Sequence, residues 1–257
     1  MRKCLSVIIL CLACVSSRAQ FTHGTTGLLE MPTADMQKDK TFMLGGGYLH
    51  RSITPANWSY NTWNYYLNIT IFPWLEVAYT CTIFNDWIKR DTWIHRKNQD
   101  RNYSARLRLW KEGWWKSWTP QIVAGANDIG TSGEGGVGAG DGTNSNGFWN
   151  RYFLAVTKHF QFQKVGNLGV HASYLYNRRK DNPINGPAVG ANFRFCLAGD
   201  SFWQKAINGI NLMAEYDSKD VNIGGSYSVW KDRINGFLEF SRCKYPSAGI
   251  CLKVCLK

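Results

Sequence analysis

Polar and apolar residues alternate along most of the chain, most regularly between residues 102 and 110. One face of that segment carries Tyr103, Ala105, Leu107 and Leu109, and the other carries Asn102, Ser104, Arg106 and Arg108. Because side chains along a strand point alternately to its two faces, this period of two predicts a β-strand. A turn at 111–113 and a second extended segment at 121–126 complete a β-hairpin.

Three tryptophans, Trp114, Trp115 and Trp118, crowd the turn of this hairpin. A turn that faces water rarely contains three tryptophans. At a bilayer interface, in contrast, the indole ring lies among the lipid headgroups while its N–H stays hydrated. The hairpin therefore indicates a β-barrel embedded in a membrane.

The same alternation recurs at the spacing expected of barrel strands. It marks segments at about 41–50, 60–71, 75–83, 152–157, 168–176, 189–197, 210–216, 221–229, 234–240 and 250–256. With the hairpin this gives about twelve strands, an even number, as bacterial single-chain barrels prefer. We therefore predict an all-β fold, a transmembrane antiparallel β-barrel of about 12 strands, over residues 41–257.

A soluble β-sandwich or a lipocalin-like barrel shows the same alternation, with its apolar face turned inward. The sequence leaves open which face is wet, although the strand number and the tryptophans at turns favour lipid outside. The mean hydropathy of −0.31 is compatible with a transmembrane barrel, whose apolar residues alternate with polar ones. A helical membrane protein is excluded, because beyond residue 20 no run approaches the roughly 18 apolar residues that a helical span needs.

The first 19 residues predict a signal peptide. Arg2 and Lys3 precede an apolar run from Leu5 to Val15, and Ser17 and Ala19 are the small residues that a signal peptidase reads. Cleavage would start the mature chain at Gln20. The alternative is a lipoprotein acylated at Cys14.

Residues 20–40 contain two glycines and a proline in the stretch from Gly24 to Ala34 and do not alternate cleanly. We expect an irregular N-terminal segment here. It is either a lead-in to the first strand or a plug in the mouth or lumen of the barrel, where irregular backbone is tolerated.

The formal net charge is +12, and removal of the signal peptide, with Arg2, Lys3 and Arg18, leaves +9. A basic exported protein favours anionic partners such as acidic glycans or lipopolysaccharide phosphates, and not nucleic acid. Five cysteines remain, and their spacing predicts neither a disulfide framework nor a zinc site.

Two segments are expected to be long loops. One is the charged stretch Asp86 to Asp100, and the other is the glycine-rich stretch Gly130 to Gly147, which lacks the features of a phosphate-binding loop. Because two predicted strands separate them, both should lie on the outer side of the barrel.

Several charged residues share the face that must point inward if the apolar face meets lipid. The basic ones are Arg106, Arg108, Arg194 and Lys253, and the acidic ones are Glu76, Glu215 and Glu239. One interpretation is an internal salt-bridge network that rigidifies the barrel. The other is a basic strip that contacts an acidic glycan through planar guanidinium donors.

Five pieces of the sequence, in this order, resemble the YjbH-like family of outer-membrane exopolysaccharide and capsule biosynthesis proteins. They are the segment Gly24 to Ala34, Phe72-Pro-Trp-Leu-Glu76, Ser104-Ala-Arg-Leu-Arg-Leu-Trp-Lys-Glu112, Pro120 to Gly130, and Tyr152 to Lys158. The resemblance implies a barrel in the cell outer membrane that acts in polysaccharide export or surface assembly. Together with the basic charge of the chain, it gives the expected partners: outer-membrane lipid, an acidic polysaccharide and other proteins of a secretion system.

The resemblance carries over no catalytic residue, and we expect no enzyme, no cofactor and no metal. The five histidines are scattered and no hydrolase motif is present. Two alternatives stay open. One is an outer-membrane enzyme whose site is assembled from distant strands, and the other is a porin for small solutes.

Overall fold

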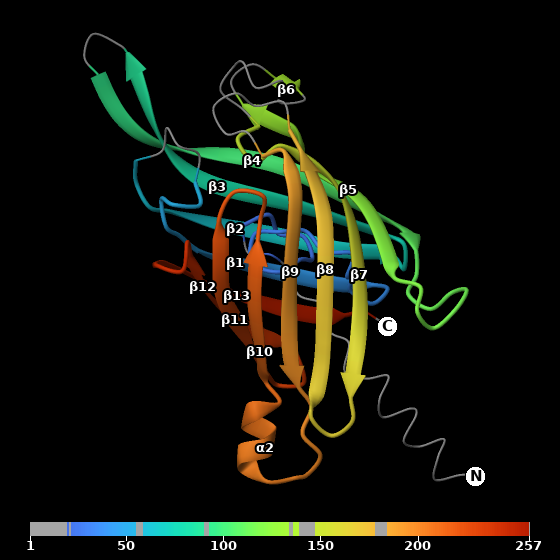
Figure 1. Ribbon diagram of the computed structural model, residues 1–257. Coiled ribbons are helices and arrows are strands. Elements are labelled where there is room, and N and C mark those ends of the chain that lie inside the picture. The colour runs from blue at the N-terminus through green and yellow to red at the C-terminus, as the bar shows by residue number, and fades with distance from the viewer. Residues whose placement is uncertain are drawn as a thin grey trace.

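The computed structural model describes residues 20, 22–54, 59–89, 93–133, 136–138, 147–177 and 184–256. Within them a 13-stranded antiparallel sheet closes on itself through the pairing of β4 with β5. One member, β6, is only three residues long and flanks β5, so that twelve strands form the barrel wall (Figure 1). The fold predicted from the alternation is confirmed.

Each strand of the wall pairs with its neighbours in sequence, and β1 pairs with β13. The strands are β1 (Thr41–Leu49), β2 (Thr62–Phe72), β3 (Leu75–Lys89), β4 (Trp93–Trp110), β5 (Gln121–Gly133), β6 (Gly136–Gly138), β7 (Arg151–Phe162), β8 (Gly166–Tyr176), β9 (Gly186–Phe195), β10 (Ile210–Tyr216), β11 (Val221–Val229), β12 (Ile234–Ser241) and β13 (Tyr245–Cys255). A short helix, α2 (Phe202–Ile207), joins β9 to β10 and is capped by Ser201 and Gln204.

The apolar face of the wall points outward and the polar face points inward. Leu107 and Leu154, for example, are 42% and 49% exposed, whereas Asn68 and Ser104 are buried. A soluble barrel of the lipocalin type would show the reverse. Because an outward apolar band is what a hydrocarbon environment selects, the barrel is of the transmembrane type.

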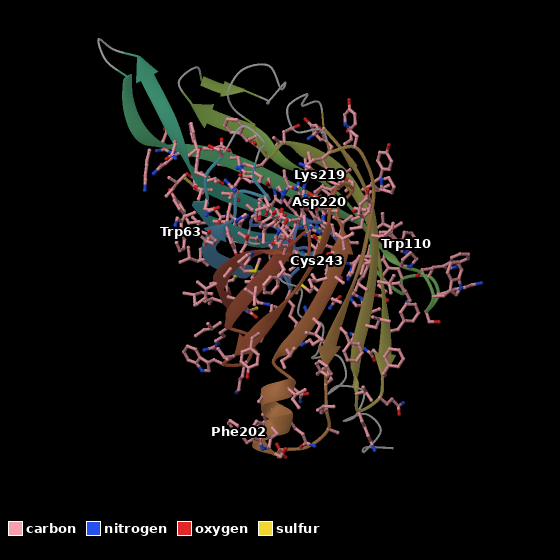
Figure 2. The ribbon with its side chains drawn as sticks, turned by 60° about the vertical axis from the view of Figure 1, so that its left-hand side comes forward. Trp63, Trp110, Phe202, Lys219, Asp220 and Cys243 are labelled. Carbon is pink, nitrogen blue, oxygen red and sulfur yellow. The ribbon has the colours of Figure 1, made fainter. Side chains whose placement is uncertain are left out.

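Exposed aromatic side chains mark both ends of this band. At the end that carries the C-terminus lie Phe72, Trp74, Trp110, Trp114, Trp115, Trp118, Phe160, Phe162, Phe202, Trp203 and Trp230, and at the other end lie Trp63, Tyr65, Tyr103, Tyr152, Tyr174, Tyr176 and Tyr216. Trp63, Trp110 and Phe202 lie on the outside of the barrel, as Figure 2 shows. Two such belts fit the two interfaces of a bilayer.

The prediction of a loop at Asp86 to Asp100 is wrong for residues 86–89 and 93–100, and residues 90–92 lie outside the described ones. There β3 and β4 continue as a paired hairpin, with register partners from Thr82 and Asp100 to Lys89 and Trp93, and it projects beyond the wall in Figure 1. Backbone hydrogen bonds do not need apolar side chains, so a ribbon that leaves the membrane can be charged on both faces. This end of the barrel is opposite the one that carries the C-terminus.

Part of the stretch Gly130 to Gly147 is also paired. Residues 131–133 of β5 bond to β6, which the sequence did not predict, while most of the remaining stretch lies outside the described residues. The predicted signal peptide, residues 1–19, lies outside them too. No helix in the described ranges is long and apolar enough to cross a membrane.

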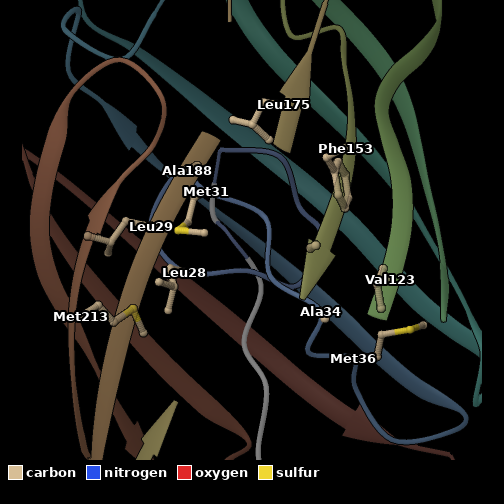
Figure 3. Packing of buried hydrophobic residues seen from close by; sticks show 11 residues of the cluster. Leu28, Leu29, Met31, Ala34, Met36, Val123, Phe153, Leu175, Ala188 and Met213 are labelled. Carbon is tan, nitrogen blue, oxygen red and sulfur yellow. The ribbon is translucent and has the colours of Figure 1, made fainter. Parts of the chain in front are cut away.

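Residues 20 and 22–40 enter the barrel, and we call them the lumenal segment. Its apolar residues Leu28, Leu29, Met31, Ala34 and Met36 pack inside the barrel against residues of the wall, namely Val123, Phe153, Ala155, Leu175, Ala188 and Met213 (Figure 3). The barrel thus has an interior core. That core consists of its own N-terminal residues and a few apolar positions on an otherwise polar wall.

Candidate functional site

The lumen is the candidate site, and a tight turn of the lumenal segment lies at its centre. Leu28 N–H donates to Met31 O (3.1 Å), which closes the turn. The amides of Leu29, Glu30 and Met31 all point at the carboxylate of Glu215 on β10, with N···O distances of 3.0, 2.7 and 3.1 Å. One buried carboxylate therefore satisfies three backbone donors that would otherwise be unpaired inside the barrel.

A second carboxylate, Glu76 on β3, holds the segment at Thr26. It accepts from the Thr26 amide (2.6 Å) and hydroxyl (2.8 Å), and from the side-chain amide of Asn68 (2.8 Å). Arg106 Nη1 lies 3.6 Å from Glu76 Oε1, and both side chains are fully buried. The pair is neutral overall, as a buried ion pair must be to persist.

Two arginines of the wall bind backbone carbonyls of the segment. Arg106 donates to the carbonyl oxygens of Thr26, Thr33 and Asp35. Arg151, at the start of β7, donates to Glu30 O (2.6 Å) and to Gln20 Oε1 (3.0 Å). Because a guanidinium offers five donors in a rigid plane, each arginine fixes several points of an irregular backbone.

Glycines make room for the segment at close approaches. Gly24 has φ +67°, and a Cβ there would lie 2.7 Å from Tyr66 Cβ and 2.8 Å from Thr80 Oγ1. On the wall, a Cβ at Gly190 would lie 2.6 Å from Leu28 Cδ1. The segment and the wall are therefore complementary in shape as well as in hydrogen bonding.

A cluster around His159 of β7 links the lumenal segment to the tryptophan-rich turn. His159 Nδ1 lies 2.7 Å from Glu112 Oε2, and its Nε2 lies 3.4 Å from Asp35 Oδ1. Burial by itself would raise the pKa of Asp35, but the nearby His159 brings that pKa below its usual value. The pKa of Glu112 is also lowered, because hydrogen bonds from His159 and Lys158 outweigh its burial.

A second histidine lies near the opposite mouth. His23 Nε2 is 3.7 Å from Glu30 Oε2, and the His23 ring meets the Trp149 ring edge to face at 5.8 Å. Burial raises the pKa of Glu30 to about 8. Burial, together with the charge of Arg151, lowers the pKa of His23 well below its usual value. Both groups are therefore uncharged near neutral pH.

The four basic residues singled out from the sequence lie on three strands, each separated from the next by three others, and do not form one strip. Arg106 is buried and occupied by the segment. Lys253 donates to Asp232 (2.6 Å) and Gln37 (3.1 Å), and Arg194 lies half-buried on β9. Arg108 is half-buried, and its Nε is a buried donor without a partner among the described residues.

Sequence reasoning placed Glu76, Glu215 and Glu239 on the inward face but missed Arg151 and His159 as segment contacts. The signal for Arg151 was available. The inward positions Phe153, Ala155 and Thr157 extend back by one step of two to residue 151. Which inward residues bind the segment could not be found this way, because the alternation gives a face and not a partner.

One lumenal arrangement has the residue types of a hydrolase triad. Thr157 Oγ1 lies 2.9 Å from His171 Nδ1, and His171 Nε2 lies 2.8 Å from Asn192 Oδ1. Thr157 is fully buried, and its hydroxyl also accepts the Ala34 amide at 2.9 Å. The lumenal segment covers the hydroxyl that would have to attack a substrate, so in this structure the arrangement binds the segment.

These features define the class of protein: a transmembrane antiparallel β-barrel whose polar lumen is filled by its own N-terminal segment. A family model described as "YjbH: Exopolysaccharide biosynthesis protein YbjH" matches residues 19–223. The chain belongs to this YjbH family.

Two comparisons with individual proteins add to this. The chain is 30% identical over 194 residues to the lipoprotein YjbH of Escherichia coli (strain K12), an alignment that covers 72% of this chain and 23% of that protein. The chain thus spans about a quarter of the length of that relative. Among solved structures, the calcium-bound outer membrane phospholipase dimer of Salmonella typhi aligns with a TM-score of 0.38 and 14% identity, over 85% of this chain and 91% of that one.

Proposed function

We propose that the protein resides in the cell outer membrane and acts in the export or surface assembly of an exopolysaccharide, as a barrel that is closed at rest. Membership of the YjbH family supports the polysaccharide role. The outward apolar band and its two aromatic belts support the membrane. Outer-membrane lipid is then one partner, and the polysaccharide and other secretion proteins are the others.

The observation that carries the resting closure is the burial of the lumenal side chains. Arg106 and Glu76 lie on the neighbouring strands β4 and β3, Thr157 lies on β7, and each of the three is fully buried. In an open channel these side chains would touch water. A porin role for small solutes is therefore the weaker candidate, since twelve strands leave a narrow lumen and the segment occupies it.

We also propose that the protein is not an enzyme. The imidazoles near carboxylates take part in contacts inside the barrel: His159 bridges Asp35 and Glu112, and the His23 ring lies beside Glu30 and packs edge to face on Trp149. The hydroxyl beside His171 is covered by the segment. A polysaccharide role that depends on binding and assembly fits these buried groups better than catalysis does.

A chromosomal deletion tests the proposal. Loss of the protein should change the amount or surface display of an exported polysaccharide, measured by sugar analysis of the washed cell surface and of the medium. Uptake of a small antibiotic that enters through porins should stay near its normal rate. Normal surface polysaccharide together with a large fall in antibiotic uptake would instead identify a porin.

A further inference from the structure

A cavity opens at the barrel end opposite the C-terminus. It contains about 590 Å³ of empty space, including its opening to solvent. His23 and Glu30 of the lumenal segment form its floor, Ile53 and Trp149 are apolar wall residues, and Lys219 belongs to its rim. Figure 2 shows Lys219 and the neighbouring Asp220 on the β10–β11 turn.

The floor of this mouth cavity is held rigidly. Thr80 Oγ1 donates to the carbonyl of His23 (2.9 Å), Glu215 accepts the amide of Glu30 (2.7 Å), and Arg151 donates to the carbonyl of Glu30 (2.6 Å). A ligand that binds there meets groups that are already ordered. The entropy cost of ordering the site on binding is therefore small.

The charges around the mouth cavity nearly balance. The floor residues His23 and Glu30 are uncharged near neutral pH for the reasons given above. On the rim, Asp220 is paired with Arg242 (2.9 Å), and Asp217 accepts the amides of Lys219 (2.9 Å) and Asp220 (2.7 Å). The ammonium of Lys219 has no partner within the described part of the chain. Arg151 also lines the cavity, but its guanidinium is already bonded to Glu30 O and Gln20 Oε1. Two cations beside two carboxylates leave no net positive charge to attract a polyanion.

We propose that the mouth cavity binds one uncharged, hydroxyl-rich sugar residue of a glycan chain. Sugar hydroxyls both donate and accept, as do the Glu30 carboxyl and the hydroxyls of Ser52 and Ser241, while the Lys219 ammonium donates to hydroxyl oxygens. Ile53 and Trp149 offer apolar contact to the C–H face of the ring. The proposal rests on the polysaccharide role proposed above and adds to it the site and the class of sugar.

Calorimetric titration of the purified full chain in detergent tests this site. The probe is the mixture of oligosaccharides that mild acid releases from the exopolysaccharide of the producing bacterium, fractionated into neutral and acidic pools. The neutral pool should bind saturably to the wild type. Ile53→Trp, which fills the cavity, should abolish the binding, and Lys219→Ala should weaken it about tenfold, as expected for loss of one charge-assisted hydrogen bond.

The matched control is Lys97→Ala, which removes an exposed lysine from β4 near the same end of the barrel but outside the cavity. It should leave the affinity unchanged. Each variant must keep the heat-dependent gel shift of the assembled barrel. If only Ile53→Trp loses that shift, this variant has not folded. The affinity of Lys219→Ala for the neutral pool then tests the proposed site.

Binding of the acidic pool alone, equal binding by all variants, or no saturable binding to the wild type would overturn the proposed sugar site. None of these results would contradict the polysaccharide role itself. If the deletion strain has a changed surface polysaccharide but the purified protein binds no neutral sugar, the role is supported and the proposed site is wrong. If the protein binds neutral sugar but the deletion strain has an unchanged surface polysaccharide, the site is supported and the proposed role is wrong.

Discussion

Arg106 and Glu76 lie 3.6 Å apart on neighbouring strands, and neither side chain reaches solvent. Each also binds the lumenal segment, Glu76 at Thr26 and Arg106 at three carbonyl groups. The pair therefore fixes a piece of chain that, by its sequence, could equally have stayed outside the barrel.

Arg106→Gln should lower the free energy of unfolding strongly, by about 3–5 kcal/mol, because it leaves the Glu76 charge buried without its partner. Arg108→Gln is the matched control, since Arg108 lies two residues along the same strand and is only half-buried. It should change stability little. Urea unfolding in detergent micelles, followed by tryptophan fluorescence, measures both variants. Equal losses would show that the Arg106 contacts do not contribute in the way their geometry indicates.

Two lumenal carboxylates should differ in how their replacement by methionine changes the stability of the barrel. Glu215→Met leaves three backbone amides of the segment unpaired and should cost at least about 1–3 kcal/mol. Glu239 is fully buried, and neither of its oxygens has a partner among the described residues, so Glu239→Met should be neutral or stabilising. Each variant is heated in steps before electrophoresis, and the temperature at which the band of the folded barrel disappears measures its stability. A less stable Glu239→Met variant would reveal a partner for that carboxyl.

Glu30 should make stability fall as the pH rises. Its pKa is raised by burial from 4.5 to about 8, so the folded state holds a proton that the unfolded chain has released. The resulting stability is fully present below about pH 4.5 and is lost progressively up to about pH 8. Glu30→Gln cannot ionise, and its stability relative to the wild type should therefore increase across this window. A constant difference in urea midpoint from pH 4.5 to 8 would contradict the assignment.

Much of the wall follows from local sequence, because a period of two is a property of neighbouring residues. It predicted the twelve barrel strands and the inward faces of Glu76 and Glu215. The strand pairing at 86–89 and 93–100 was missed because the sequence there is rich in charged residues and resembles a loop. The filling of the lumen could not be derived either: the amide of Leu29 binds Glu215, 186 residues away. A local pattern does not predict which segments that lie far apart in the sequence will contact each other.

The most direct test of the closed lumen is the conductance of the purified protein in a planar lipid bilayer. The wild type should show no steady ionic current, because the lumenal segment occupies the polar interior. A variant that lacks residues 22–37 should assemble less stably, but once inserted it should conduct. A wild type that conducts as well as this deletion variant would contradict the account, since the segment would then not close the barrel.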